Sequence, residues 1–333
     1  MRIMLKEGLA KTLRKALPEA GLFYLGLGTR CFLAEAGDRQ YVLKERFDLA
    51  FRKERRTLEF LMAKGFPHVP VYHGVLRANG RRYLVSDYIS GEDLHHRTLA
   101  PGQMRDLVQV LARFHALKTG AACPAVRCVR KSLDRAGHQK RILMAAVRIN
   151  RSTTAVRCAR YLDHLGQKIV FAVEEGAVAG RALVTPALLH SDLDFRRGEN
   201  GRLYMIDMED FTLGDPVWDL AGVCQAFTGV TDKAVLKSYA EHNYLDDESA
   251  ARLRLYRLLL SFLDLISLVM ELICISRGRI AVSGQKEQAF QRAFVEGVDR
   301  VSVLLTQVQE GNITRGHLPG LVTLREMSPF IVA

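Results

Sequence analysis

Residues 188–210, LLHSDLDFRRGENGRLYMIDMED, place two apolar runs beside six chemically active side chains: His190, Asp192, Asp194, Asp207, Glu209 and Asp210. The runs LLH and LYMID predict two short buried strands, and the polar GENG between them predicts a turn. Burying a carboxylate is costly unless a cation or a hydrogen-bond donor meets it. The stretch therefore predicts a site for a positive group, and a metal ion is the first candidate.

The composition is that of a soluble globular protein with a surplus of positive charge. The chain has 333 residues, of which 48% are hydrophobic, so one large domain or two lobes can bury a sizeable core. The net charge of +12 favours anionic partners such as phosphate groups, nucleic acid, or an anionic membrane or glycolipid surface. A generally basic surface without a partner is the alternative.

The positive charge gathers in residues 127–160. Ten of these residues are Lys or Arg and Asp134 is the only acid, which gives the segment a net charge of +9. A solvated helix face usually interleaves both signs. The segment is therefore interpreted as an anion-binding or surface-docking element, against the alternative of a merely solvated basic insertion.

The cysteines and apolar runs indicate the compartment. Cys123 and Cys128 are separated by four residues, but the chain has no second Cys or His pair at zinc-site spacing. The six cysteines are therefore interpreted as structural thiols in a reduced compartment. The N-terminal segment MRIMLKEGLAKTLRKAL has no uninterrupted apolar core, which argues against a signal peptide. Asp264 and Glu271 interrupt the apolar run 258–275, which favours a buried helix over a membrane span. We expect a cytoplasmic protein whose basic residues allow peripheral contact with the inner face of the membrane.

Local patterns predict mainly strands before residue 95 and mainly helices after residue 100. CFLA and YVLK flank the turn AGDRQ, and VPVYHGVL and RRYLVSDYI flank RANG, so two hairpins are expected. Helical spacing runs over 51–64 up to Gly65, and over Pro101 to Leu117. Long helices are expected from residue 232 onward.

The chain also offers the parts that phosphoryl transfer requires. Gly26 and Gly28 in YLGLGTRCF would let backbone N–H groups approach phosphate oxygens, although an ordinary hairpin turn is the alternative. Strand alternation puts Lys44 on one face with Val42, so a buried Lys44 needs an acid, and Glu54 is the natural partner. A surface lysine is the alternative. The chain lacks G-x-x-x-x-G-K-[ST], which argues against a P-loop enzyme.

Four segments resemble the protein-kinase-like fold, in the branch of aminoglycoside phosphotransferases and choline-kinase-like enzymes. They are YVLKE, FRKERRTLEFLMAKGFPHVP, VLARFHAL and HSDLD…YMIDMEDFTLGDPVWDLA, in the family's order over roughly residues 20–225. The resemblance implies a two-lobed α+β fold. Residues 1–93 would form a small, mainly antiparallel β N-lobe with one key helix. Residues 94–333 would form a mainly helical C-lobe, with 127–160 as a basic insertion on the acceptor side.

The resemblance also implies how ATP is held. Lys44 would contact the α and β phosphates and pair with Glu54, under the turn of Gly26 and Gly28. The hinge would hold adenine through its backbone groups, from Ser86, Asp87, Tyr88 and Ile89.

At the reacting end, the resemblance implies that Asp192 lies at the acceptor hydroxyl as a base or orienting group and that Asp207 binds Mg²⁺. His190 would hold the catalytic loop. Asp215 and Asp219 in GDPVWDLA would brace the loop rather than touch substrate, and Asp215 could cap the following helix.

One position departs from the family pattern. The asparagine expected five residues after Asp192, as second metal ligand, is replaced by Arg197, which cannot bind a cation. The loop is also about two residues short before GRLYMID. A deletion inside the loop moves Asp194 into the asparagine's place, and carboxylate suits Mg²⁺. Asn200 is the other candidate, although GENG indicates a turn.

The expected function is ATP-dependent transfer of the γ-phosphate, with Mg²⁺, to a hydroxyl. The basic segment disfavours a cationic acceptor and suits a sugar phosphate, a lipopolysaccharide core or a lipid head group. The first alternative is a non-catalytic protein that binds nucleotide or docks on a surface. The second is a protein kinase, against which the chain has no D-F-G or A-P-E. Specific nucleic-acid binding is not expected, because aromatic residues do not interleave the basic segment.

Overall fold

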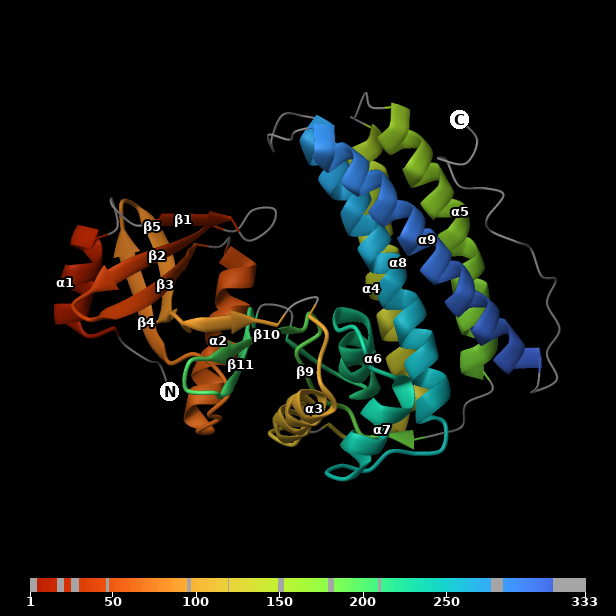
Figure 1. Ribbon diagram of the computed structural model, residues 1–333, viewed down its shortest axis with the longest axis horizontal. Helices are drawn as coiled ribbons and strands as arrows, with labels where there is room; N and C mark the ends of the chain where they lie inside the picture. Colours follow the sequence, from red (N-terminus) through yellow and green to blue (C-terminus); the bar gives the residue numbers. More distant parts are fainter. Residues whose placement is uncertain are drawn as a thin grey trace. The chain divides into compact units, whose positions relative to one another are not determined.

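The computed structural model describes residues 5–16, 21–24, 30–45, 48–94, 97–118, 120–148, 153–178, 183–208, 211–276 and 284–313. It is an α+β protein with antiparallel strands in its N-terminal part and long helices in its C-terminal part (Figure 1). The chain forms two compact units. Unit 1 comprises Met1–Lys118, Leu188–Leu213 and Ala226–Val230, and unit 2 comprises the remainder. The division into lobes at residue 93 stays a prediction.

Unit 1 contains a five-stranded sheet in the order β1-β2-β3-β5-β4, with antiparallel neighbours. Its strands are β1 (Gly21–Tyr24), β2 (Arg30–Ala36), β3 (Arg39–Glu45), β4 (Tyr72–Ala78) and β5 (Arg81–Asp87). Both predicted hairpins are confirmed. Gly37 and Gly80 turn them with φ of +65° and +71°, which glycine adopts without steric cost.

Unit 1 also contains two helices that contact the five-stranded sheet, α1 (Glu7–Ala16) and α2 (Asp48–Ala63). Tyr41 and Leu43 of β3 are buried on one sheet face with Ala10 and Leu13 of α1. Because side chains alternate along a strand, Lys44 points to the opposite face. The predicted alternation is thus confirmed, and it directs a lysine to the face that α1 does not cover.

Unit 1 also holds a three-stranded sheet in the order β11-β10-β6. Its strands are β6 (Gly91–Asp93), β10 (Asp194–Gly198) and β11 (Leu203–Ile206). The predicted turn at GENG is confirmed as the connection between β10 and β11, but the strand before it is β10 and not the run LLH. The helix α3 (Pro101–His115) contacts β11. The short strands β9 (Ala187–Leu189) and β12 (Thr212–Gly214) pair with each other where the chain passes between units.

Unit 2 is built on long helices. Its described elements are β7 (Cys123–Pro124), α4 (Ala125–Arg148), α5 (Thr153–Val178), β8 (Leu183–Val184), α6 (Val217–Ala226), α7 (Asp232–Ala240), α8 (Ser249–Ser276) and α9 (Gly284–Ile313). α8 packs against α4, α5 and α9, and these four helices run side by side in Figure 1. Among the described helices, α8 included, none is long and apolar enough to cross a membrane.

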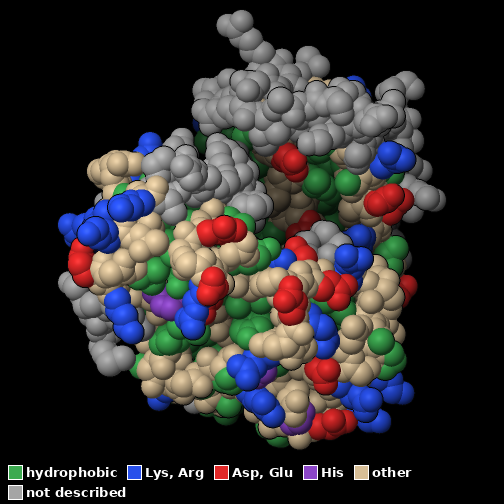
Figure 2. All heavy atoms as spheres, turned by 60° about the vertical axis from the view of Figure 1, so that its left-hand side comes forward, with side chains coloured by type: hydrophobic (Ala, Val, Ile, Leu, Met, Phe, Trp, Pro, Cys, Tyr) green, Lys and Arg blue, Asp and Glu red, His purple; other side chains and the backbone are tan. Residues whose placement is uncertain are grey.

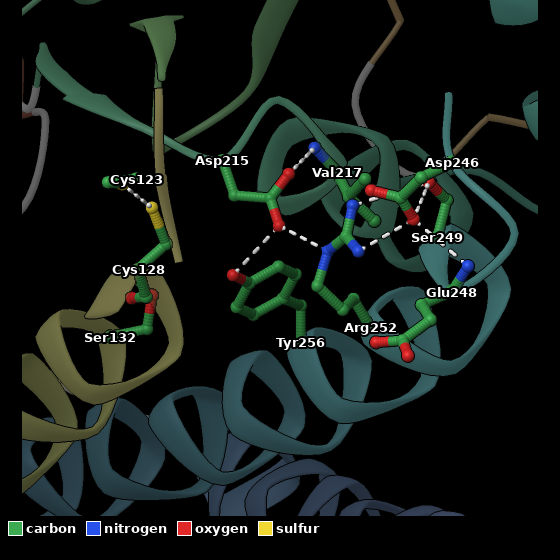
Figure 3. A network of polar contacts seen from close by, with 10 residues as sticks. All are labelled: Cys123, Cys128, Ser132, Asp215, Val217, Asp246, Glu248, Ser249, Arg252 and Tyr256. Atoms are coloured by element: carbon green, nitrogen blue, oxygen red, sulfur yellow. Dashed lines mark hydrogen bonds and ion pairs between the residues drawn. The ribbon is translucent and has the colours of Figure 1, made fainter. Parts of the chain in front are cut away.

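A buried polar network fixes the start of α6 in unit 2 (Figure 3). One oxygen of Asp215 accepts from the backbone N–H of Val217 at 3.1 Å, which confirms the predicted helix cap. The other accepts from Arg252 Nε at 2.7 Å and from Tyr256 Oη at 3.1 Å. Arg252 Nη1 also donates to Asp246 at 2.8 Å.

The network sets the ionisation of its members. Burial alone would lower the pKa of Arg252, but its bonds to Asp246 and the charge of Asp215 raise it above the usual range. Burial raises the pKa of Tyr256 well above its ordinary value, and the charge of Asp215 acts in the same direction. Arg252 therefore stays charged and Tyr256 stays neutral, so that both donate to Asp215.

Replacing Arg252 by Met should destabilise the protein by about 3–5 kcal/mol, because it leaves the buried Asp215 carboxylate without its cation. Tyr256→Phe should cost only about 1 kcal/mol, the net value of one hydrogen bond. Arg257→Met is the control on the same helix: its pair with Asp232 is partly exposed, so the cost should be at most about 1 kcal/mol. Urea denaturation measures all three, and equal effects of Arg252→Met and Arg257→Met would contradict the account.

Candidate active site

A buried lysine joins three segments of unit 1. Lys44 at the end of β3 is 7% exposed, and its Nζ lies 3.0 Å from Oε1 of Glu54 on α2, which is 4% exposed. The same Nζ contacts Oδ1 of Asp207, the residue that follows β11. The structure thus brings together Lys44, Glu54 and Asp207, three residues singled out in the sequence.

The cluster joins two carboxylates to one ammonium group. A buried ion is stable only when opposite charge compensates it, and Glu54 and Asp207 compensate Lys44. The Asp207 side chain keeps 22% of its surface exposed, so a ligand approaching from solvent can reach it. Asp207 is therefore the most accessible member of the cluster.

Asp207 has an unusual backbone conformation, with φ of +58°. Left-handed backbone in a residue other than glycine is uncommon, and such strain concentrates at functional sites. β11 ends at the preceding residue and is paired with β10, which fixes the chain up to this point. The strained backbone directs the carboxylate of Asp207 toward Lys44.

The register of the β10–β11 hairpin places a second acidic residue, Asp194, at the end of the hairpin that Asp207 follows. Asp194 pairs with Ile206, the residue before Asp207, so Asp194 and Asp207 lie together at the open end of the hairpin. Asp192 is exposed and lies in the bend between β9 and β10. The strand predicted from LLH does not continue to Asp192: β9 stops at Leu189, and the chain turns at Ser191, where φ is +73°.

His190 ties this bend to β11. It is fully buried, and its Nε2 lies 2.8 Å from the carbonyl oxygen of Ile206. Because a carbonyl oxygen only accepts, Nε2 must carry the proton. The bond joins His190, two positions before Asp192, to Ile206, the residue before Asp207. It therefore ties the segment that carries Asp192 to the segment that carries Asp207.

The two arginines of β10 point to backbone groups. Arg197 lies in β10 opposite Leu203, and its Nη1 donates to the carbonyl of Gly201 in the turn at 3.4 Å. Arg196 Nη2 donates to the carbonyl of Gly91 at 3.0 Å, and its guanidinium lies over the ring of Tyr88. The register therefore brings Asp194, and not Arg197, next to Asp207.

Asn200 belongs to the turn between the strands. Its Nδ2 donates to Tyr204 Oη at 2.9 Å, and its Oδ1 accepts from the backbone N–H of Arg202 at 3.0 Å. These are contacts of a turn residue, as GENG indicated. Asn200 is thus separated from Asp207 by the length of the hairpin.

A pocket of about 460 Å³ opens at the segment that follows β5. Three of the four predicted hinge residues line it: Asp87, Tyr88 and Ile89. The other lining residues are Ser90 directly after the hinge, Arg39 and Gln40 of β3, and Gly198, Glu199, Asn200 and Tyr204 of the β10–β11 hairpin. The Tyr88 N–H donates to the carbonyl of Gln40 at 3.0 Å, which holds the segment against β3. Sequence reasoning missed the other lining residues, because strand pairing brings them together.

The fourth hinge residue, Ser86, lies on the sheet face that carries Lys44. It pairs with Val42, and Val42 pairs with Leu33 of β2. Ser86, Val42 and Leu33 are half-buried, so an apolar strip leads from Lys44 toward the pocket. Gly26 and Gly28 lie outside the described residues.

The comparison with protein families identifies the family of the chain. The model of the phosphotransferase enzyme family matches residues 25–256, which is more than half of the chain. This span includes Lys44, Glu54, the hinge and the whole β10–β11 hairpin. No curated protein sequence matches the chain.

Solved structures of the same architecture resemble the chain. The choline kinase LicA from Streptococcus pneumoniae matches with a TM-score of 0.57 at 18% identity, over 86% of this chain and 94% of that one. Spectinomycin phosphotransferase, APH(9)-Ia, solved with ADP and spectinomycin, matches with a TM-score of 0.60 at 11% identity, over 92% and 99%. Likeness at this identity establishes the fold and leaves the acceptor open.

Replacing Lys44 by Met should cost about 3–5 kcal/mol of stability, since Glu54 would remain buried without its cation. Adding Glu54→Gln should recover at least about 1 kcal/mol, because the uncompensated charge is removed with it. The matched control is Arg81→Met. It breaks the partly exposed ion pair between Arg81 of β5 and Glu45, which follows Lys44 on β3, and it should leave the urea midpoint unchanged. A double variant less stable than Lys44→Met would contradict the coupling.

Proposed function

Because the chain belongs to the phosphotransferase enzyme family, whose members transfer phosphate to hydroxyl acceptors, we propose that it moves the γ-phosphate of Mg-ATP to a hydroxyl of an anionic small molecule or glycolipid. The observation that carries the proposal is the placement of the Lys44 ammonium between Glu54 and Asp207. In phosphoryl transfer, positioning and charge stabilisation provide most of the catalysis. Lys44, oriented by Glu54, would bind the α and β phosphates.

The carboxylates of Asp207 and Asp194 suit a magnesium ion. Mg²⁺ is usually held by one or two carboxylates together with substrate phosphates, rather than by an all-protein cage. This fits the structure, since the described residues contain no cluster of three or more His, Cys, Asp or Glu that could hold a metal alone. The ion would neutralise charge that develops on the transferred phosphoryl group. When ATP arrives, Lys44 would exchange its contact with Asp207 for the phosphates.

The hinge pocket would receive the base of ATP. The rings and alkyl groups of Tyr88, Ile89 and Tyr204 offer apolar contact, and the backbone of Ser86, Asp87, Tyr88 and Ile89 would supply the polar groups that orient adenine. Gly26 and Gly28 would cover the phosphates.

Asp192 would act at the acceptor hydroxyl. Its exposure leaves the carboxylate accessible to a substrate, and the bond from His190 to Ile206 holds its bend beside the metal ligands. As base or orienting group, Asp192 would take or hold the hydroxyl proton while the oxygen attacks phosphorus. A protein kinase is disfavoured, because β12 begins at Thr212, which leaves little chain after Asp207 for an activation segment.

The acceptor is proposed to be anionic because of the charges on α4. Lys140 pairs with Asp163 at 2.9 Å and Arg135 lies over Trp218, so these two have partners within unit 2. Four further arginines of α4 are exposed along one side: Arg127, Arg130, Arg141 and Arg148. On the face drawn in Figure 2, by contrast, basic and acidic side chains are interspersed. The exposed arginines suit a sugar phosphate, a lipopolysaccharide core or the head groups of an anionic membrane surface.

Labelled γ-phosphate from Mg-ATP should enter one fraction of a host extract, either small molecules or lipids with lipopolysaccharide. Asp192→Asn should lower the rate by about 10²–10⁴-fold, the usual value of a positioned base, and Asp207→Asn should abolish the Mg²⁺-dependent transfer. Asp38→Asn, an exposed acid in the β2–β3 turn, is the control and should transfer normally. ATP binding without transfer to any fraction would support the non-catalytic alternative instead.

Charge reversal on α4 tests the acceptor. Arg130→Glu with Arg141→Glu should raise KM for an anionic acceptor at least about tenfold while KM for ATP stays constant, because surface charge acts on the partner that it attracts. Arg300→Glu on α9 is the matched exposed control. Turnover of only neutral or cationic acceptors, with no response to the double reversal, would refute an anionic acceptor.

A further inference from the structure

Two cysteines of unit 2 lie close enough to react with each other. Cys123 Sγ and Cys128 Sγ are 3.7 Å apart (Figure 3). Cys123 is in β7 and half-buried, whereas Cys128 is in the first turns of α4 and only 7% exposed. The remaining cysteines, Cys31, Cys158, Cys224 and Cys274, are all buried.

The backbones that carry the two thiols are fixed. Cys123 pairs with Val184 of β8, and Ser132 Oγ donates to the Cys128 carbonyl at 3.3 Å within α4. Cys128, Ala125 and Val184 form a small apolar cluster on which Cys123 packs. A disulfide has a sulfur–sulfur length of about 2.05 Å. The two sulfur atoms, 3.7 Å apart, must therefore approach by less than about 2 Å for the bond to form.

We propose that Cys123 and Cys128 are a redox-sensitive modification site, which forms a reversible disulfide when the protein meets a peroxide. The partly exposed Cys123 is the thiol that a small oxidant in solution reaches. Cys128, held against it from the protein interior, is the thiol that resolves the oxidised form. In a reduced compartment both cysteines rest as thiols.

The reaction balances in two steps. The Cys123 thiolate attacks hydrogen peroxide, the O–O bond breaks, and Cys123 becomes a sulfenic acid with release of hydroxide, which takes up the proton that the thiol lost and leaves as water. The sulfur of Cys128 then attacks the sulfur of Cys123 while its proton passes to the oxygen of the neighbouring sulfenic acid: the S–S bond forms, the S–O bond breaks, and the oxygen leaves as water. Two thiols and one peroxide thus give one disulfide and two waters.

The electrostatics assign the two roles. Burial raises the pKa of the Cys128 thiol to about 12, and its hydrogen bond to Cys123 acts in the same direction. Cys128 therefore keeps its proton at neutral pH and is a poor first target, because the thiolate is the form that peroxide oxidises. Burial likewise raises the pKa of Cys158 and Cys224 to about 12, so these residues serve as internal references.

The sequence between the cysteines provides a direct readout. Trypsin cuts after Arg127, between the two cysteines, so a disulfide would join peptide 119–127 to peptide 128–130. The full-length protein is treated with hydrogen peroxide, blocked with N-ethylmaleimide, digested and analysed by mass spectrometry. The joined peptides should appear, lighter by two hydrogen atoms than the separate ones together, and dithiothreitol should separate them. The thiols titrated in denaturant should fall from six to four.

Two variants serve as controls. Cys123→Ser should abolish the joined peptide, and Cys274→Ser, which removes a buried cysteine, should leave it unchanged. The wild-type result decides the matter even if a variant folds poorly. Oxidation of Cys123 to a sulfinic acid with Cys128 still alkylated, pairing of either residue with another cysteine, or no reaction at peroxide levels that oxidise free cysteine would each overturn the proposal.

Discussion

A lysine ammonium that is almost fully buried must be surrounded by carboxylates, and this requirement organises unit 1. Lys44 reaches its position because β3 buries Tyr41 and Leu43 against α1 and so directs Lys44 to the other face. Glu54 meets it from α2, and Asp207 meets it from the end of β11. Sheet, helix and hairpin are thus connected through one cation.

The hairpin register resolves the departure of this chain from the family pattern. Arg197 stands where the resemblance places an asparagine, which suggested an inactive relative. In the structure Arg197 faces the turn, whereas Asp194 lies opposite Ile206 and beside Asp207. The register therefore places Asp194, rather than Arg197, at the open end of the hairpin. Its role as a second metal ligand stays a prediction.

Much of this could be predicted from the sequence because the signals are local. Turn residues fixed both hairpins of the large sheet, and alternation placed Lys44 on the face opposite Leu43. Other features could not be predicted, because they depend on partners distant in the chain. β6 is a short exposed segment without periodicity, and it is a strand only because it pairs with β10. The pocket at Tyr88 and Ile89 depends equally on Gln40 and Tyr204.

Calorimetric titration of ATP, with and without Mg²⁺, tests the central claim most directly. If the cluster of Lys44, Glu54 and Asp207 binds the metal complex of the nucleotide, Mg²⁺ should tighten ATP binding to the wild type by at least about tenfold, a coupling of 1.4 kcal/mol. Asp207→Asn should still bind ATP but lose this gain. Equal affinity with and without Mg²⁺ in the wild type, or an undiminished gain in Asp207→Asn, would contradict the account.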